Sequence, residues 1–122
     1  MKVLLVIAII TMAFFVIHFL FPLVQVCGDS MYPTYKDGEI LIGYRTFLKS
    51  HLKIGDVIIF KCPTDGRTVV KRIADISTQV DGEDILFYCL GDNSEHSYDS
   101  RSYGYFSSRN LICRVFKQRR HI

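Results

Sequence analysis

The segment from Val3 to Val26 contains no charged side chain, and this feature constrains the fold more than any other. Its main polar residues are Thr11, His18 and Gln25. A helix rises about 1.5 Å per residue, so a stretch of this length can cross a bilayer core of roughly 30 Å. We therefore expect residues 1–22 to form a transmembrane anchor and residues 23–122 to form one β-rich domain beyond it.

A cleavable signal peptide is the alternative interpretation of this segment. Its apolar core is usually about 7 to 15 residues long and ends in small residues of the Ala-x-Ala kind, which residues 21–26 do not offer. Lys2 and the amino terminus are the only positive charges before the span. They weakly favour a cytoplasmic amino terminus and a domain on the extracytoplasmic face.

Composition limits what the rest of the chain can do. The 122 residues leave room for one modest core after the anchor. The formal net charge is +3, and the basic residues are spread out except for Arg114, Lys117, Arg119 and Arg120. This distribution does not indicate nucleic-acid binding. The basic group near the end is typical of a solvated tail, with contact to anionic lipid headgroups as the alternative.

Cysteine and histidine spacing gives no sign of a metal site. Cys27, Cys62, Cys89 and Cys113 are far apart, with no Cys-x-x-Cys pair, and the four histidines share no metal-ligand spacing. We expect neither a metal nor a cofactor. One or two disulfides in an oxidising compartment and buried free thiols are both compatible with the spacing.

Short strands separated by turn residues are predicted after the anchor. Pro22 disfavours helical dihedrals at Phe21, so the helix should end near Leu20 and an extended segment should follow at 24–26. The turn signals are Asp37-Gly38, Gly55-Asp56, Thr64 to Arg67 and Asp81-Gly82. The predicted strands are 39–42, 57–60, 68–73, 76–80, 85–90 and 111–116, with one long polar loop at 93–109. The predicted fold class is mainly β.

Ser30 is the candidate nucleophile. It lies in the sequence Gly28-Asp29-Ser30-Met31-Tyr32-Pro33-Thr34, a few residues after the apolar segment. A serine hydroxyl needs a neighbouring base, and no Ser, His and Asp set stands out as a triad. Lysine is the remaining candidate base. Its pKa must fall by several units from about 10.4, which burial among apolar groups can achieve.

Lys71 is the lysine whose pattern fits that role. Strand alternation places Val69, Lys71 and Ile73 on one face, so Lys71 is flanked by β-branched apolar residues. Lys61 is the rival because it also lies on a predicted strand. On pattern alone, a strand lysine whose ammonium reaches solvent and an ordinary turn serine are the alternatives.

Three motifs, in order behind the apolar segment, resemble those of type I signal peptidases, the membrane-anchored Ser/Lys endopeptidases of the S26 family. The first is Gly28 to Thr34, and the second is Gly55 to Phe60 leading to Val69-Val70-Lys71-Arg72-Ile73. The third begins at Gly91-Asp92-Asn93 and continues through Ser97, Asp99-Ser100-Arg101 and Tyr103-Gly104. The resemblance covers roughly residues 1–115.

The resemblance implies a role for each matching residue. Ser30 would attack the scissile carbonyl, and Lys71 would act as the general base. Ser97 would hydrogen-bond to Lys71 and orient it, while Asp99 and Arg101 would form a supporting ion pair. The implied fold is a compact signal-peptidase-like β domain on a single amino-terminal transmembrane helix.

The resemblance also implies a substrate and an oxyanion site. The Ser30 backbone N–H would stabilise the oxyanion. Some family members add a hydroxyl two residues earlier, where this chain has Gly28, so the second donor stays open. Met31 would line a pocket for small residues in the signal-peptide region of secretory precursor proteins at the membrane. A dedicated maturation peptidase for one pilin or metalloenzyme precursor, and a non-catalytic membrane-anchored β binding domain, are the alternative functions.

Overall fold

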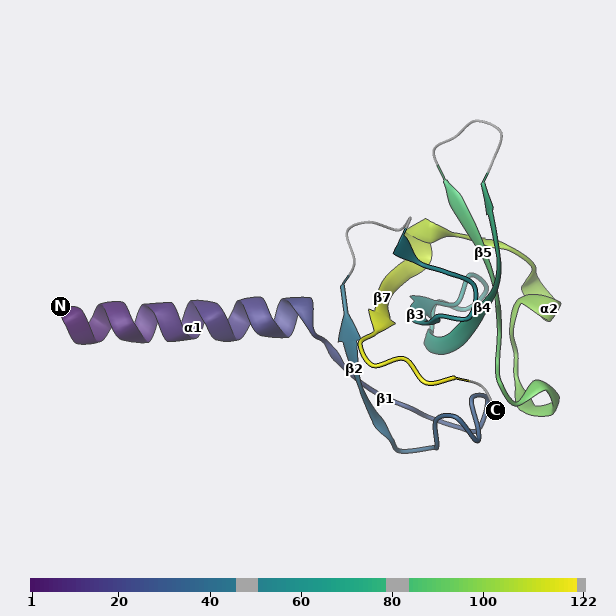
Figure 1. The fold of residues 1–122 in the computed structure, drawn as a ribbon, viewed down its shortest axis with the longest axis horizontal. Helices are drawn as coiled ribbons and strands as arrows, with labels where there is room; N and C mark the ends of the chain where they lie inside the picture. Colours follow the sequence, from purple (N-terminus) through teal and green to yellow (C-terminus); the bar gives the residue numbers. More distant parts are fainter. Residues whose placement is uncertain (46–50, 79–83, 121–122) are drawn as a thin grey trace.

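The computed structural model describes residues 1–45, 51–78 and 84–120 (Figure 1). One helix, α1 (Lys2–Leu20), extends away from a β domain that contains the remaining elements. None of its residues is buried, and it is long and apolar enough to cross a membrane. The helix ends at Leu20, as the position of Pro22 predicts.

Seven strands make up the sheet of the described residues, and every neighbouring pair is antiparallel. They are β1 (Leu23–Gln25), β2 (Ile40–Tyr44), β3 (Val57–Lys61), β4 (Thr68–Thr78), β5 (Ile85–Leu90), β6 (Phe106–Ser107) and β7 (Leu111–Val115). Their order is β1-β2-β7-β3-β4-β5-β6. The short helical segments η2 (Ser94–His96), α2 (Ser100–Tyr103) and η3 (Ser108–Asn110) lie between β5 and β7 in the sequence. The predicted mainly β fold is confirmed.

Two details differ from the sequence prediction. The predicted strand at 68–73 and the described part of the one predicted at 76–80 belong to one long strand, β4, whose register against β5 shifts between Ile73 and Asp75. Residues 79 and 80 lie outside the described residues. A β-bulge accommodates an extra residue without ending the strand, so the polar interruption there is not a turn. The predicted polar loop at 93–109 contains α2 and β6. The predicted Asp81-Gly82 turn lies outside the described residues.

Strand β3 lies between two hydrophobic clusters, and its residues alternate between them. Val57 and Ile59 belong to the first cluster, whereas Ile58 and Phe60 belong to the second. All four side chains are fully buried, as the two-residue period of a strand buried on both faces requires. The first cluster is completed by Val26, Met31, Tyr35, Leu41, Cys113 and Val115, and the second by Leu52, Ile73, Phe87, Cys89 and Phe106. The first cluster therefore anchors the segment around Ser30, and the second anchors the part of β4 next to Lys71.

Candidate active site

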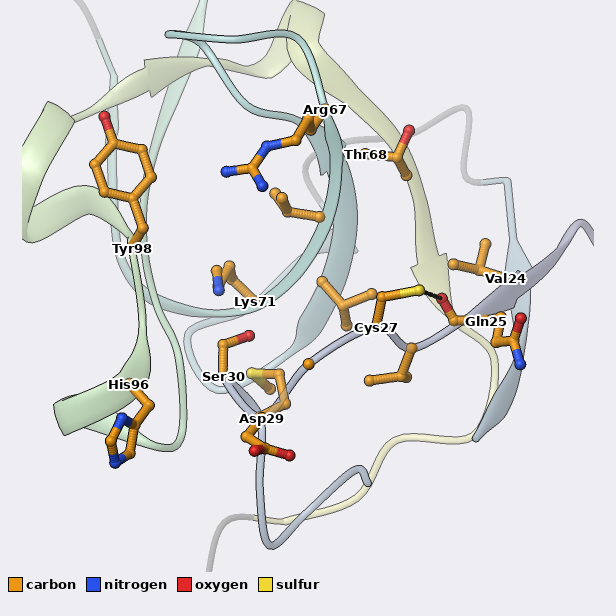
Figure 2. A pocket seen from close by; sticks show the side chains of 15 residues that line it. Val24, Gln25, Cys27, Asp29, Ser30, Arg67, Thr68, Lys71, His96 and Tyr98 are labelled. Atoms are coloured by element: carbon orange, nitrogen blue, oxygen red, sulfur yellow. Dashed lines mark hydrogen bonds between the residues drawn. The ribbon is translucent and has the colours of Figure 1, made fainter. Parts of the chain in front are cut away.

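The segment that carries Ser30 and the start of β4 border a single pocket of about 370 Å³ (Figure 2). Ser30, Met31 and Lys71 all line it. The other lining residues are Val24 to Asp29, Arg67 to Val70, His96 and Tyr98. The structure thus brings together the predicted nucleophile, the predicted base and the predicted substrate-contacting residue.

The Ser30 segment is attached to the hydrophobic core by the buried residues that follow Ser30. Met31 and Tyr35 are 1 % and 0 % exposed, respectively, within the first hydrophobic cluster. The Tyr35 N–H donates to the Met31 carbonyl at 2.9 Å, which closes a turn just after Ser30. On the other side, Gly28 has a φ of 91°, and its N–H donates to the Asp37 carboxylate at 2.8 Å. These contacts leave Ser30 on the pocket side of the turn.

The Gly91-Asp92-Asn93 segment, which is distant in the sequence, makes hydrogen bonds to the same turn. The Asn93 N–H donates to the Ser30 carbonyl at 2.9 Å, and Asn93 Nδ2 donates to the Asp29 carbonyl at 3.0 Å. At Gly91, a Cβ atom would lie 2.6 Å from the Ser30 carbonyl oxygen and 2.1 Å from Ser97 Oγ. No side chain fits there, which explains why this motif begins with glycine. From the sequence motif alone Asn93 has no assigned role, because no local pattern connects it with Ser30.

Lys71 is buried on β4, with only 4 % of its surface exposed. Its neighbour on the same face, Ile73, is 1 % exposed, and Lys71 is paired with Ile58 of β3. Burial lowers the pKa of Lys71 because desolvation disfavours the charged ammonium, while the negative charge of Asp99 opposes this shift. The rival candidate, Lys61, is exposed at the end of β3.

Asp99 and Arg101 form an ion pair beside Lys71. The Asp99 side chain is fully buried and accepts hydrogen bonds from Arg101 Nε at 2.9 Å, Arg101 Nη2 at 2.8 Å and the Gly91 N–H at 3.0 Å. Burial alone would raise the pKa of Asp99, but these hydrogen bonds lower it to about 2. Asp99 is therefore a carboxylate at neutral pH, and it supplies a fixed negative charge near the lysine.

Ser97 lies beside Gly91 and Asp99 but does not make the hydrogen bond to Lys71 that the sequence predicted. Its hydroxyl is buried beside Gly91 and close enough to Asp99 to help keep the pKa of that carboxyl low. Within the described residues, however, no partner meets Ser97 Oγ at hydrogen-bonding geometry. The predicted hydrogen bond from Ser97 to Lys71 is thus not formed in this structure, and its orienting role stays a prediction.

Two strand edges border the pocket and have no strand partner there among the described residues. Strand β5 pairs with β4 only from Arg72 to Thr78, so residues 68–71 of β4 pair with β3 alone. Likewise, β1 pairs with β2 alone. An extended peptide can bind such edges through its own backbone groups. The pocket therefore suits a polypeptide in the extended conformation.

Cysteines and possible metal ligands form no further centre in the part of the chain that the structure describes. No group of three or more His, Cys, Asp or Glu side chains is placed to hold a metal ion there. All four cysteines are free thiols, which is one of the two states that the spacing allowed. Cys27 is exposed and lines the pocket, whereas the other three are buried.

A serine in a pocket with a buried lysine is an arrangement suited to a hydrolase that works by acyl transfer. The family model described as "Signal peptidase, peptidase S26" matches residues 1–79, well over half of the chain. The chain therefore belongs to the S26 signal peptidase family, as the motifs indicated. The match includes Ser30 and Lys71 but ends before Ser97, Asp99 and Arg101. No curated protein is similar enough to count as a match.

Proposed function

We propose that this chain is a membrane-anchored serine endopeptidase that removes signal peptides from secretory precursors, with Ser30 as the nucleophile and Lys71 as its base. The observation that carries the proposal is the position of Lys71. A lysine with 4 % exposure and a lowered pKa lines the same pocket as Ser30. Membership of the S26 family supports peptidase activity and precursors that bear signal peptides as substrates.

The reaction proceeds in two acyl-transfer steps. Neutral Lys71 takes the proton of the Ser30 hydroxyl as Ser30 Oγ attacks the scissile carbonyl, and the Ser30 N–H donates to the oxyanion. Collapse of this intermediate breaks the peptide bond, the lysine ammonium gives its proton to the leaving amine, and an acyl-enzyme remains. Lys71 then activates a water that hydrolyses the ester and releases Ser30.

Neighbouring residues set the conditions for this chemistry. Burial lowers the pKa of Lys71 and so favours its neutral amine over the ammonium. The Asp99 carboxylate, held by Arg101, stabilises the lysine when it becomes charged during the reaction. Burial and the Asp99 charge therefore shift the pKa of Lys71 in opposite directions, which suits a group that must both accept and release a proton.

The position of the pocket suits a substrate that emerges from a membrane. Strand β1 follows α1 after a short connection, and its residues Val24 and Gln25 line the pocket directly. The pocket wall also contains Val26, Met31 and Val70, which are apolar. An extended precursor segment can bind against the free edges of β1 and β4, with small side chains directed at these apolar residues. We place the domain on the extracytoplasmic face, on the basis of Lys2 before the span.

Cleavage of a model secretory precursor by the detergent-solubilised full-length protein tests the proposal. Ser30→Ala and Lys71→Met should each abolish processing at an Ala-x-Ala site. Lys61→Met should leave it unchanged, because that lysine is exposed at the end of β3. A fully active Lys71→Met would exclude Lys71 as the base. A panel of different precursors, including a pilin, distinguishes general from dedicated processing, and a folded wild type that cleaves none of them would favour a binding domain.

A further inference from the structure

The segment of residues 116–120 follows β7 and runs on toward the carboxyl terminus as the yellow chain in Figure 1; we call it the strap. Gln118 fixes its path. Gln118 Oε1 accepts from the Val57 N–H at 2.6 Å, while its Nε2 donates to the carbonyls of Val57 at 3.0 Å and Val115 at 2.7 Å. The Gln118 side chain thus satisfies the backbone at the beginning of β3 as a neighbouring strand would. The strap is therefore attached to the centre of the sheet.

Arg119 of the strap contacts three residues that follow Ser30. Its Nη1 donates to the Thr34 carbonyl at 3.1 Å, and its guanidinium lies 4.9 Å from the centre of the Tyr35 ring. It also forms an ion pair with Glu39, at the end of the loop before β2. Tyr35 is in turn joined to Met31 by a backbone hydrogen bond. The Arg119 guanidinium thus contacts Tyr35, the residue whose N–H closes the turn after Ser30.

The backbone of Arg119 is connected to the other half of the site. Arg72 Nη2 donates to the Arg119 carbonyl at 2.9 Å. Arg72 directly follows Lys71 on β4 and also binds the Asp92 carboxylate through Nε at 2.9 Å and Nη2 at 2.8 Å. Asp92 itself lies next to Asn93, which holds the Ser30 carbonyl. Arg119 therefore links the strand of the base with the far side of the nucleophile turn.

We propose that Arg119 is a positioning residue that holds the Ser30 turn at a fixed distance from Lys71. This inference rests on the proposed peptidase function. The sequence predicted that Arg119 lies in a solvated tail or contacts lipid, whereas in the structure it has intramolecular partners. Arg119 lies beyond the residues that the family model matches.

The expected contribution is local and has little effect on global stability. The Arg119 and Glu39 side chains are 48 % and 24 % exposed, respectively, and exposed ion pairs add little to the free energy of unfolding. Catalysis is far more sensitive, because a small displacement of one reacting group lowers the rate strongly. Loss of Arg119 should therefore lower the rate of the chemical step without unfolding the domain.

Kinetics of Arg119→Ala, Arg119→Lys and the matched control Arg120→Ala test the catalytic part, since Arg120 is exposed. We expect Arg119→Ala to lower kcat for precursor cleavage about tenfold with KM changed less than about twofold. Arg119→Lys should recover part of kcat, because it keeps the charge next to Glu39. Arg120→Ala should behave as wild type, and all melting temperatures should agree within about 3 °C. An Arg119→Ala enzyme with unchanged kcat would overturn the proposal.

Hydrogen exchange in the full-length protein tests the structural part without any substrate. The Tyr32 and Tyr35 N–H groups donate to the Asp29 and Met31 carbonyls, so their exchange reports whether the Ser30 turn is closed. Arg119→Ala should accelerate their exchange several-fold, whereas Arg120→Ala should not. Unchanged exchange in Arg119→Ala would show that the strap does not hold the turn. A wild type that cleaves no precursor would refute the peptidase function, and this exchange experiment would still decide the role of Arg119.

Discussion

The two halves of the candidate site are held in different ways. Lys71 belongs to a regular strand, with β3 beside it and the second hydrophobic cluster around its neighbour Ile73. Ser30 belongs to an irregular turn that is tied down by distant residues, namely Asn93 on one side and Arg119 beyond Thr34 on the other. The proposed base thus lies in the sheet itself, whereas the turn of the proposed nucleophile is packed on the first hydrophobic cluster through Met31 and Tyr35 and is also held by a few long-range polar contacts. Substitutions at these contacts should impair catalysis more than stability, and substitutions around the lysine should change both.

Gly91→Ala should impair activity and stability together, because it disrupts the contact between the two halves. The new methyl group would lie 2.1 Å from Ser97 Oγ and 2.6 Å from the Ser30 carbonyl oxygen. Displacement of the Ser30 turn should lower kcat/KM about 100-fold, and overpacking should lower the free energy of unfolding by about 2 kcal/mol. Precursor cleavage and chemical denaturation measure the two effects.

Gly55→Ala is the matched control for this substitution. Gly55 has a φ of 98° with no atom within 4 Å of an added Cβ, so alanine there costs strain but causes no clash. It should lower stability by about 1 kcal/mol with activity retained. Equal losses of activity in the two variants would show that the Gly91 effect comes from general destabilisation.

Asp99→Asn, next to Lys71, should lower the free energy of unfolding by about 2 kcal/mol. The reason is that Arg101 and the Gly91 N–H lose a buried carboxylate as their partner. The pKa of Asp99 is about 2, below that of an ordinary aspartate near 4. Its contribution is therefore fully present above about pH 5 and is lost as the pH falls toward 2. Denaturation of wild type and variant from pH 3 to pH 7 should show a difference that narrows at the acidic end. A difference that does not change with pH would contradict a role for the ionised carboxylate.

Lys71→Met should abolish activity yet raise stability, by about 1 kcal/mol at pH 7. Burial lowers the pKa of Lys71, so the folded protein binds this proton less tightly than the unfolded chain does. The stability cost of the lysine is largest at low pH and disappears as the pH rises toward the pKa of an ordinary lysine. Unfolding at pH 7 and pH 10 should show that the advantage of methionine shrinks with pH. A destabilised Lys71→Met at both pH values would mean that the ammonium makes favourable interactions in the folded state.

The sequence predicted the lysine half better than the serine half, for a physical reason. A strand has a period of two residues, so neighbouring residues alone place Lys71 on the same face as Val69 and Ile73. The same pattern also fits a lysine whose ammonium reaches solvent, and the structure shows that Lys71 is buried instead. The end of α1 and the mainly β class followed from Pro22 and from the turn residues in the same local way. The contacts of Ser30 join residues far apart in the sequence, and no local pattern encodes them. Asn93, the tight fit at Gly91 and the strap contact of Arg119 therefore appeared only in the structure.

An NMR titration of Lys71 in the isotopically labelled full-length protein is the most direct test of the proposed mechanism, with Lys71→Met used to assign its signal. We predict that Lys71 titrates below the range of the exposed lysines, and at the same pH as the acidic limb of kcat/KM for precursor cleavage. In Asp99→Asn both values should move further down together, because Asp99 raises the pKa of Lys71. A Lys71 that titrates with the exposed lysines, or an acidic limb that does not follow it, would contradict the assignment of Lys71 as the base.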